Sequence, residues 1–256
     1  MVALWVGVWL GFGLISPIAV GIVFSEGLLK TFQPQAIICM VATGLIHAVY
    51  FRLIAAAYEH GEISLVYPIA RGSGIALTAV LAVLFLKESF GVAGAIGVGL
   101  IAVSIPSLCL TSQRTGVHTR AVTLALGTGG SIVVYSLVDK IGVGYISPVV
   151  YIWLMFLITA VALTPFVMWR YRGTIRQIAK QYIGYALIIG VGSVGSYLII
   201  LFAFTTAPVG YVVAVRESAI IWGSLAGIVF LKERFTTVKI VVTCLIVIGI
   251  ICIKMS

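Results

Sequence analysis

The chain has 256 residues, of which 62% are hydrophobic and only 9% are charged, with a formal net charge of +9. An average soluble domain carries about 25% charged residues, because polar side chains must cover much of a surface that faces water. The composition therefore excludes a soluble enzyme, a disordered chain and a disulfide-stapled secreted domain. It indicates an integral membrane protein with many spans.

Apolar runs long enough to cross a bilayer follow one another along the whole chain. A helix needs about 20 apolar residues to span the hydrocarbon core. This window predicts nine spans, at residues 3–24, 35–57, 65–86, 91–111, 120–138, 147–169, 185–205, 210–231 and 236–254. No basic region precedes the first run, so we interpret it as a span and not as a cleaved signal peptide.

Two further features lie along these runs. The connector Arg170–Tyr182 is basic and is expected to lie along the membrane surface. Small residues recur four apart as Gly7-xxx-Gly11 in the first span and as Gly223-xxx-Gly227 near the end of the chain. This spacing predicts tight contacts between helices, because glycine lets two backbones approach closely.

Other classes of site find no support in the sequence. The four cysteines lie singly inside apolar runs, and we interpret them as packed thiols and not as a disulfide or a zinc site. The sequence contains no HExxH, no GxSxG and no phosphate loop, and it has no basic patch with interleaved aromatics of the kind that indicates a nucleic-acid partner. We therefore expect no enzyme activity, no cofactor, no metal and no nucleic-acid partner.

An internal repeat appears at an offset of 145 residues, where Arg71–Phe90 aligns with Arg216–Phe235. Arginine, serine and isoleucine occupy the first, third and fifth positions of both stretches, and both stretches end in Phe-Leu-Lys-Glu-x-Phe. Apolar matches are common between membrane helices, but two arginines and two such ends in register are not. The match therefore indicates a duplicated unit.

The same register defines the size of the unit. Span 147–169 corresponds to 3–24, and span 120–138 corresponds to positions before residue 1. The second half thus has five spans and the first has four. Because five is odd, the two units face opposite ways in the membrane, as in many secondary transporters. We expect an all-α integral membrane fold of about nine helices in two inverted repeats, 1–111 and 120–256, a 4+5 version of a 5+5 plan.

These features resemble the EamA-type branch of the drug/metabolite transporter superfamily. In that family each repeat typically has a helix ending in Leu-Gly-Glu-Arg, where this sequence has LKES at 86–89 and LKER at 231–234. Lysine in place of glycine is a departure from the family pattern. The resemblance covers almost the whole chain and lacks only the family's first helix. It implies transport of small metabolites, often export, without fixing the substrate.

Arg71 and Arg216 are the strongest candidates for a binding site, since ionisable groups inside a membrane span are unfavourable and usually functional. Their planar guanidinium groups suit a carboxylate or a phosphate. We expect them to line a central cavity between the repeats and to attract an anionic group. The alternative is that each reaches an interface or holds backbone carbonyls.

Tyr67, Glu217 and His47 complete the predicted binding residues. Tyr67 lies four residues before Arg71 and so shares a helix face with it. Glu217 either pairs with Arg71 across the repeat interface or takes up and releases a coupling proton. His47 is either a packed interior histidine or part of the site.

Glu88 and Glu233 are interpreted as structural residues at helix junctions. Each stands just before a following helix, where a carboxylate can accept the free N–H groups of the first turn.

Lysine and arginine also predict orientation. One side of the membrane receives nine of these residues from the connectors and the other receives four. The positive-inside rule then places residue 1 in the cytoplasm and the C-terminus outside. The resemblance implies the opposite for the C-terminus.

The sequence as a whole predicts a multi-pass secondary transporter or exporter in a bacterial inner membrane, moving a small anionic metabolite by alternating access. One alternative is a flippase or exporter for an amphipathic or lipid-linked substrate. Another is a membrane subunit or scaffold that transports nothing. The oligomeric state is not predicted.

Overall fold

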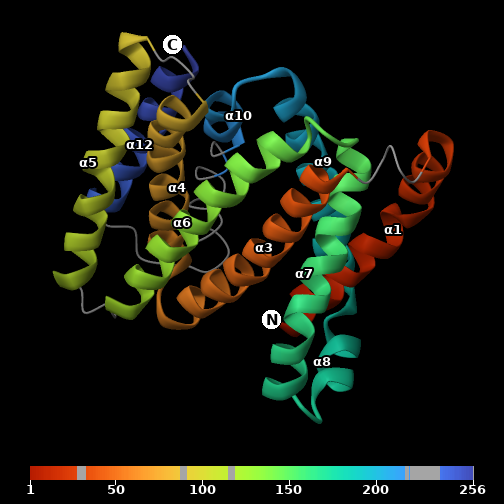
Figure 1. Ribbon diagram of the computed structural model, residues 1–256. Helices are drawn as coiled ribbons and strands as arrows, with labels where there is room; N and C mark the ends of the chain where they lie inside the picture. Colours follow the sequence, from red (N-terminus) through yellow and green to blue (C-terminus); the bar gives the residue numbers. More distant parts are fainter. Residues whose placement is uncertain (28–32, 87–90, 115–118, 217–218, 220–236, 256) are drawn as a thin grey trace. The chain divides into compact units, whose positions relative to one another are not determined.

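The computed structural model describes residues 1–27, 33–86, 91–114, 119–216, 219 and 237–255. Within these residues all regular secondary structure is α-helix (Figure 1). The helices are α1 (Val2–Glu26), α3 (Pro34–His60), α4 (Ile63–Leu86), α5 (Val92–Arg114), α6 (Thr119–Gly142), α7 (Pro148–Arg170), α8 (Ile175–Gln181), α9 (Ile183–Thr206), α10 (Val209–Arg216) and α12 (Thr237–Lys254).

The predicted spans coincide with these helices to within a few residues. Five helices are long and apolar enough, over the described residues, to cross a membrane: α1, α3, α6, α7 and α9. The span predicted at 210–231 is described only over α10 and at Ala219. The one clear difference is α6, which was expected to end at residue 138 and continues to Gly142.

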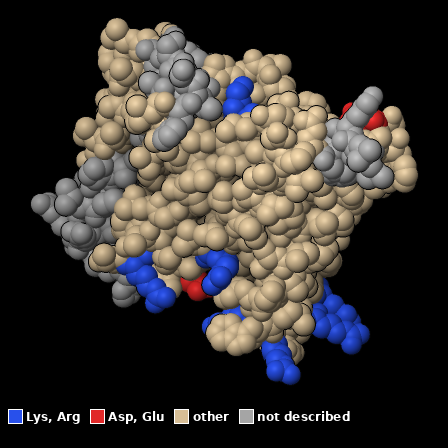
Figure 2. Space-filling view, in the orientation of Figure 1, with Lys and Arg blue, Asp and Glu red and all other residues tan. Residues whose placement is uncertain are grey.

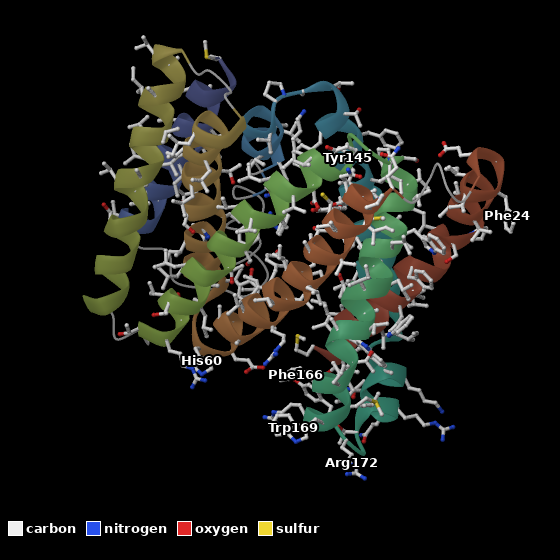
Figure 3. All side chains as sticks on the ribbon, in the orientation of Figure 1. Phe24, His60, Tyr145, Phe166, Trp169 and Arg172 are labelled. Atoms are coloured by element: carbon white, nitrogen blue, oxygen red, sulfur yellow. The ribbon has the colours of Figure 1, made fainter. Side chains whose placement is uncertain are left out.

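The visible surface is largely apolar, as expected for a protein that contacts lipid. Figure 2 shows mainly uncharged side chains with few lysines and arginines among them. Large apolar side chains are exposed on several helices, such as Phe24 on α1 (79% exposed) and Trp169 on α7 (77%), both labelled in Figure 3. Hydrocarbon tails can cover such groups at little cost, whereas water cannot. The short basic helix α8 has no buried residue, and its position along the membrane surface stays a prediction.

The described residues form two compact units. Unit 1 contains Met1–Phe51 and Val138–Thr206, and unit 2 contains Arg52–Leu137 and Ala207–Ser256. The boundaries fall inside α3 and α6, so each of these helices contributes to both units. Each unit also takes residues from both predicted repeats, and the repeat boundaries themselves stay a prediction.

In unit 1, α1 packs against α7 and α9. The contact with α9 is close because it is made by glycines: a Cβ added at Gly190 would lie 2.7 Å from the carbonyl oxygen of Gly7. A Cβ added at Gly11 would lie 2.6 Å from the ring of Phe156 on α7. The tight contact predicted from Gly7-xxx-Gly11 is confirmed. The second pattern, Gly223-xxx-Gly227, lies outside the described residues.

In unit 2, α5 packs against α4 and α12, and α10 packs against α4 and α12. Glycines again set the spacing. A Cβ at Gly249 on α12 would lie 2.7 Å from the Gly97 carbonyl oxygen on α5, and one at Gly129 on α6 would lie 2.8 Å from the Ala70 carbonyl oxygen on α4. Both units therefore depend on close helix packing, as expected where lipid provides no hydrophobic drive for helices to associate.

Candidate functional site

Asp139, the only aspartate in the sequence, is a buried polar residue of unit 1 that accepts several hydrogen bonds. It lies in the last turn of α6 and its exposed fraction is 0%. A buried carboxylate is unfavourable unless hydrogen bonds compensate for the lost water. Its partners therefore decide what this position can do.

Three hydroxyl groups donate to the Asp139 carboxylate, and they come from three different helices. Thr43 Oγ1 on α3 donates to Oδ1 at 2.6 Å, and Tyr151 OH on α7 donates to the same oxygen at 2.8 Å. Tyr197 OH on α9 donates to Oδ2. A single carboxylate thus connects α3, α7 and α9 to α6.

Local packing brings these helices close enough for the hydroxyls to reach. A Cβ at Gly142 would overlap the ring of Tyr151, so the absence of a side chain makes room for that ring beside the end of α6. On α3, a Cβ at Gly44 would lie 2.7 Å from the Ile158 side chain of α7. Thr159 Oγ1 on α7 also donates to the Gly44 carbonyl oxygen at 3.0 Å.

His47 lies one helical turn after Thr43 and is 4% exposed. Its Nδ1 is 2.9 Å from the Thr43 carbonyl oxygen and 3.3 Å from Thr43 Oγ1. Its ring meets the Tyr197 ring edge-on, with 5.3 Å between centroids, and lies 6.2 Å from the rings of Tyr50 and Phe51. The prediction of a packed interior histidine and that of a functional one both fit this burial.

Arg71 and Tyr67 lie together on α4 in unit 2. The guanidinium carbon of Arg71 is 5.4 Å from the centre of the Tyr67 ring. The predicted shared face is confirmed, and the binding role of the two residues stays a prediction. At this distance the positive guanidinium is attracted by the electron-rich face of the ring.

Arg216 makes a similar contact with a residue that was not predicted. It is the last residue of α10, and its guanidinium carbon is 5.7 Å from the centre of the Tyr135 ring on α6. Tyr135 is buried, and α10 packs against α4, the helix that carries Arg71. Both repeat-related arginines therefore have a tyrosine ring beside them in unit 2.

The remaining predicted residues are distributed differently. His47 belongs to unit 1, together with Asp139, whereas Arg71, Tyr67 and Arg216 belong to unit 2. Glu217, Glu88 and Glu233 lie outside the described residues, so their predicted roles stay predictions. Among the residues that the structure describes, no group of three or more histidine, cysteine, aspartate or glutamate side chains could hold a metal ion.

Asp139 was missed at the level of sequence because the predicted span stopped at the first charged residue. That boundary placed Asp139 and Lys140 in a connector. In the structure the helix continues, and Lys140 Nζ donates to the Phe204 carbonyl oxygen on α9 at 2.6 Å. The available signal was that the only aspartate of the chain directly follows an apolar run.

Comparison with known proteins agrees with this architecture. The model of the EamA-like transporter family matches residues 119–255, which is more than half of the chain. The Small Multidrug Resistance protein model matches residues 26–101. A comparison with curated proteins found no match. One solved crystal structure superposes with a TM-score of 0.67 at 14% identity, covering 98% of this chain and 88% of that chain, which shows a shared fold alone.

These findings confirm an all-helical, multi-pass integral membrane protein built from two halves of the drug/metabolite transporter type. Both matching families are transporters and not enzymes. The chain belongs to the EamA-like transporter family, and it is a membrane transporter of the drug/metabolite transporter superfamily.

Proposed function

We propose that this protein is a secondary transporter that exports a small anionic metabolite from a bacterial cell by alternating access. The observation that carries the proposal is the pair Arg71 and Arg216. They occupy equivalent positions of the repeat, 145 residues apart, on helices α4 and α10, which pack against each other. Each guanidinium lies beside a tyrosine ring, at 5.4 and 5.7 Å from the ring centre.

The chemistry of arginine supports an anionic substrate. A guanidinium group has five N–H donors in a planar fork, which can hold a carboxylate or phosphate through two parallel hydrogen bonds. A ring against the face of the fork restricts its orientation and leaves its edge in plane for such bonds. Placing arginine within a membrane span costs about 2.5 kcal/mol or more, so two such residues in register favour a functional role.

The proposal is tested by transport into proteoliposomes that contain the purified full-length protein. A panel of small carboxylates and phosphates is compared with neutral and cationic compounds, and a lipid-linked substrate is included for the flippase alternative. We expect saturable flux for one class of anion. Saturable flux of neutral or cationic compounds alone would contradict the proposal.

Arginine variants link the flux to the site. Arg71→Ala and Arg216→Ala should each lower anion flux by about tenfold or more, because a lost charged hydrogen bond is worth about 1.5–3 kcal/mol. Arg71→Lys keeps the charge but not the fork and should restore flux only in part. Arg172→Ala, which removes an exposed arginine of the connector after α7, is the matched control and should leave flux unchanged. Undiminished flux in both alanine variants would refute an anion site at these residues.

A further inference from the structure

We propose that His47, Thr43 and Asp139 form a proton relay and a proton-binding site inside unit 1, with Asp139 as the terminal acceptor. The inference goes beyond the arginine pair, since all three residues belong to the other unit. It rests on the proposed function only in assigning the bound proton to transport coupling. The existence of the relay is independent of the substrate.

The hydrogen-bond partners of His47 fix which ring nitrogen carries a proton. Nδ1 is 2.9 Å from the Thr43 carbonyl oxygen. A carbonyl oxygen can only accept, so Nδ1 must donate and must carry hydrogen. A neutral His47 therefore has Nε2 unprotonated, and Nε2 is the nitrogen at which an incoming proton can bind.

Thr43 connects the imidazole to the carboxylate. Its hydroxyl has a single proton, which it donates to Asp139 Oδ1 at 2.6 Å. The same oxygen is 3.3 Å from His47 Nδ1 and can accept from that N–H through a lone pair. The N–H of His47 Nδ1 is thus shared between the Thr43 carbonyl oxygen and Thr43 Oγ1, and the Thr43 hydroxyl donates onward to Asp139.

A proton can pass along this chain with every atom accounted for. A proton binds Nε2 of His47, Nδ1 gives its hydrogen to Thr43 Oγ1, and Thr43 Oγ1 gives its own hydrogen to Asp139 Oδ1. The result is a neutral aspartic acid, an intact threonine hydroxyl, and a neutral His47 with its hydrogen on Nε2. No other reactant is needed, and the net change is one proton added to the carboxylate.

Protonation also changes the contacts that hold the helices together. Tyr151 OH donates to the same Oδ1 that receives the proton. A protonated Oδ1 becomes a donor toward Thr43, so the Tyr151 hydroxyl must weaken its bond or turn away. Proton binding at Asp139 thereby loosens one connection between α6 and α7, which is the kind of local change that a transport cycle requires.

The groups around the carboxylate favour a proton over a metal cation. The described neighbours that can titrate are Cys39 and His47 on α3, Tyr151 on α7 and Tyr197 on α9, and Lys140 follows on α6 itself. The three hydroxyls that contact Asp139 direct their hydrogens toward it. A metal ion would have to displace these hydrogens from the carboxylate oxygens before it could bind there, whereas a proton would not.

The relay is tested without substrate on the purified full-length protein. Infrared difference spectra are recorded in detergent after a jump from alkaline to acidic pH, and the carbonyl band of a protonated carboxylic acid is followed. The six glutamates contribute bands of their own, so we expect an additional component that is lost in Asp139→Asn and retained in Glu26→Gln, which removes an exposed carboxylate of the same unit. Persistence of the full band in Asp139→Asn would overturn the proposal, as would a band that depends on sodium and not on pH.

Thr43 variants test the relay itself and do not require Asp139→Asn to fold. Thr43→Val keeps the shape of the side chain but removes the hydroxyl, and it should slow formation of the band by about tenfold or more. Thr43→Ser restores the hydroxyl and should restore the rate. Equal rates in all three proteins would exclude Thr43 as the carrier.

Transport assays then distinguish coupling of transport to the bound proton from binding of the substrate. In proteoliposomes, Asp139→Asn should lose accumulation of the anion driven by a pH gradient but keep exchange of labelled for unlabelled anion. Arg71→Ala should lose both while keeping the infrared band. Gradient-driven accumulation by Asp139→Asn at the level of the unchanged protein would contradict a coupling role.

Discussion

At the scale of single residues, three charged side chains within the helices have specific hydrogen-bond or ring partners. Asp139 is completely buried and receives hydrogen bonds from Thr43, Tyr151 and Tyr197. Arg71 and Arg216 each lie beside a tyrosine ring. In lipid, polar groups that lack such partners are strongly unfavourable, so these contacts reduce the cost of placing charged groups within membrane helices.

The Asp139 cluster depends on a glycine at the end of α6. A Cβ at Gly142 would overlap the Tyr151 ring, which in turn donates to Asp139. We expect Gly142→Ala to lower the free energy of unfolding by about 1–3 kcal/mol, the usual effect of crowding a packed interior. Thermal unfolding in detergent measures this effect.

Gly130→Ala is the matched control because it lies on the same helix with nothing within 4 Å of the added Cβ. Alanine favours helix over glycine by about 1 kcal/mol, so this variant should be as stable as the original or slightly more stable. Equal destabilisation by both substitutions would mean that Tyr151 does not fill the space at Gly142.

At the scale of helices, hydropathy alone predicted most of the structure. Runs of about 20 apolar residues have few alternatives to a membrane helix, so the predicted spans match the described helices closely. The same rule misplaced the end of α6, because a charged residue was taken as the end of a span. The Asp139 cluster could not be predicted for a different reason: its partners lie 96, 12 and 58 residues away along the chain.

The surroundings of the proposed binding residues could be predicted only in part. The pairing of Tyr67 with Arg71 follows from helix periodicity, since residues four apart share a face. The contact of Arg216 with Tyr135 joins α10 to α6, and a single sequence has no signal for such a distant pair. The sequence therefore identifies the two arginines, because a charged residue inside a membrane span is unfavourable. It does not identify the side chain that Arg216 contacts.

The close contact of α1 with α9 gives a prediction at this scale. A Cβ at Gly190 would lie 2.7 Å from the backbone oxygen of Gly7, which cannot move without displacing a helix. Gly190→Ala should lower the unfolding temperature in detergent, with a loss of about 1–3 kcal/mol. Gly192→Ala, on the same helix with nothing within 4 Å, should show no loss. If both variants unfold at the temperature of the original, the two helices are not packed through Gly190.

At the scale of the whole molecule, connector charges predict orientation. Nine lysines and arginines were assigned to one side and four to the other. Lys140 lies inside α6, and its side chain donates a hydrogen bond to a backbone carbonyl of α9, so we no longer count it as a connector residue. The second side then has three lysines and arginines. The asymmetry persists, and we expect the C-terminus outside the cytoplasm.

A C-terminal fusion distinguishes the two orientations. Alkaline phosphatase is active only after export, and green fluorescent protein is fluorescent only in the cytoplasm. We expect phosphatase activity without fluorescence. Fluorescence without phosphatase activity would place the C-terminus inside, as the family resemblance implies.

The repeat-related arginines are proposed to recognise a negative charge on the substrate. The most direct measurement compares flux of one transported carboxylate with flux of its neutral amide analogue, in the original protein and in the Arg71→Ala/Arg216→Ala double variant, with Arg172→Ala as control. We predict that the original protein and the control prefer the carboxylate by about tenfold or more, and that the double variant loses this preference. An undiminished preference for the carboxylate in the double variant would contradict the account.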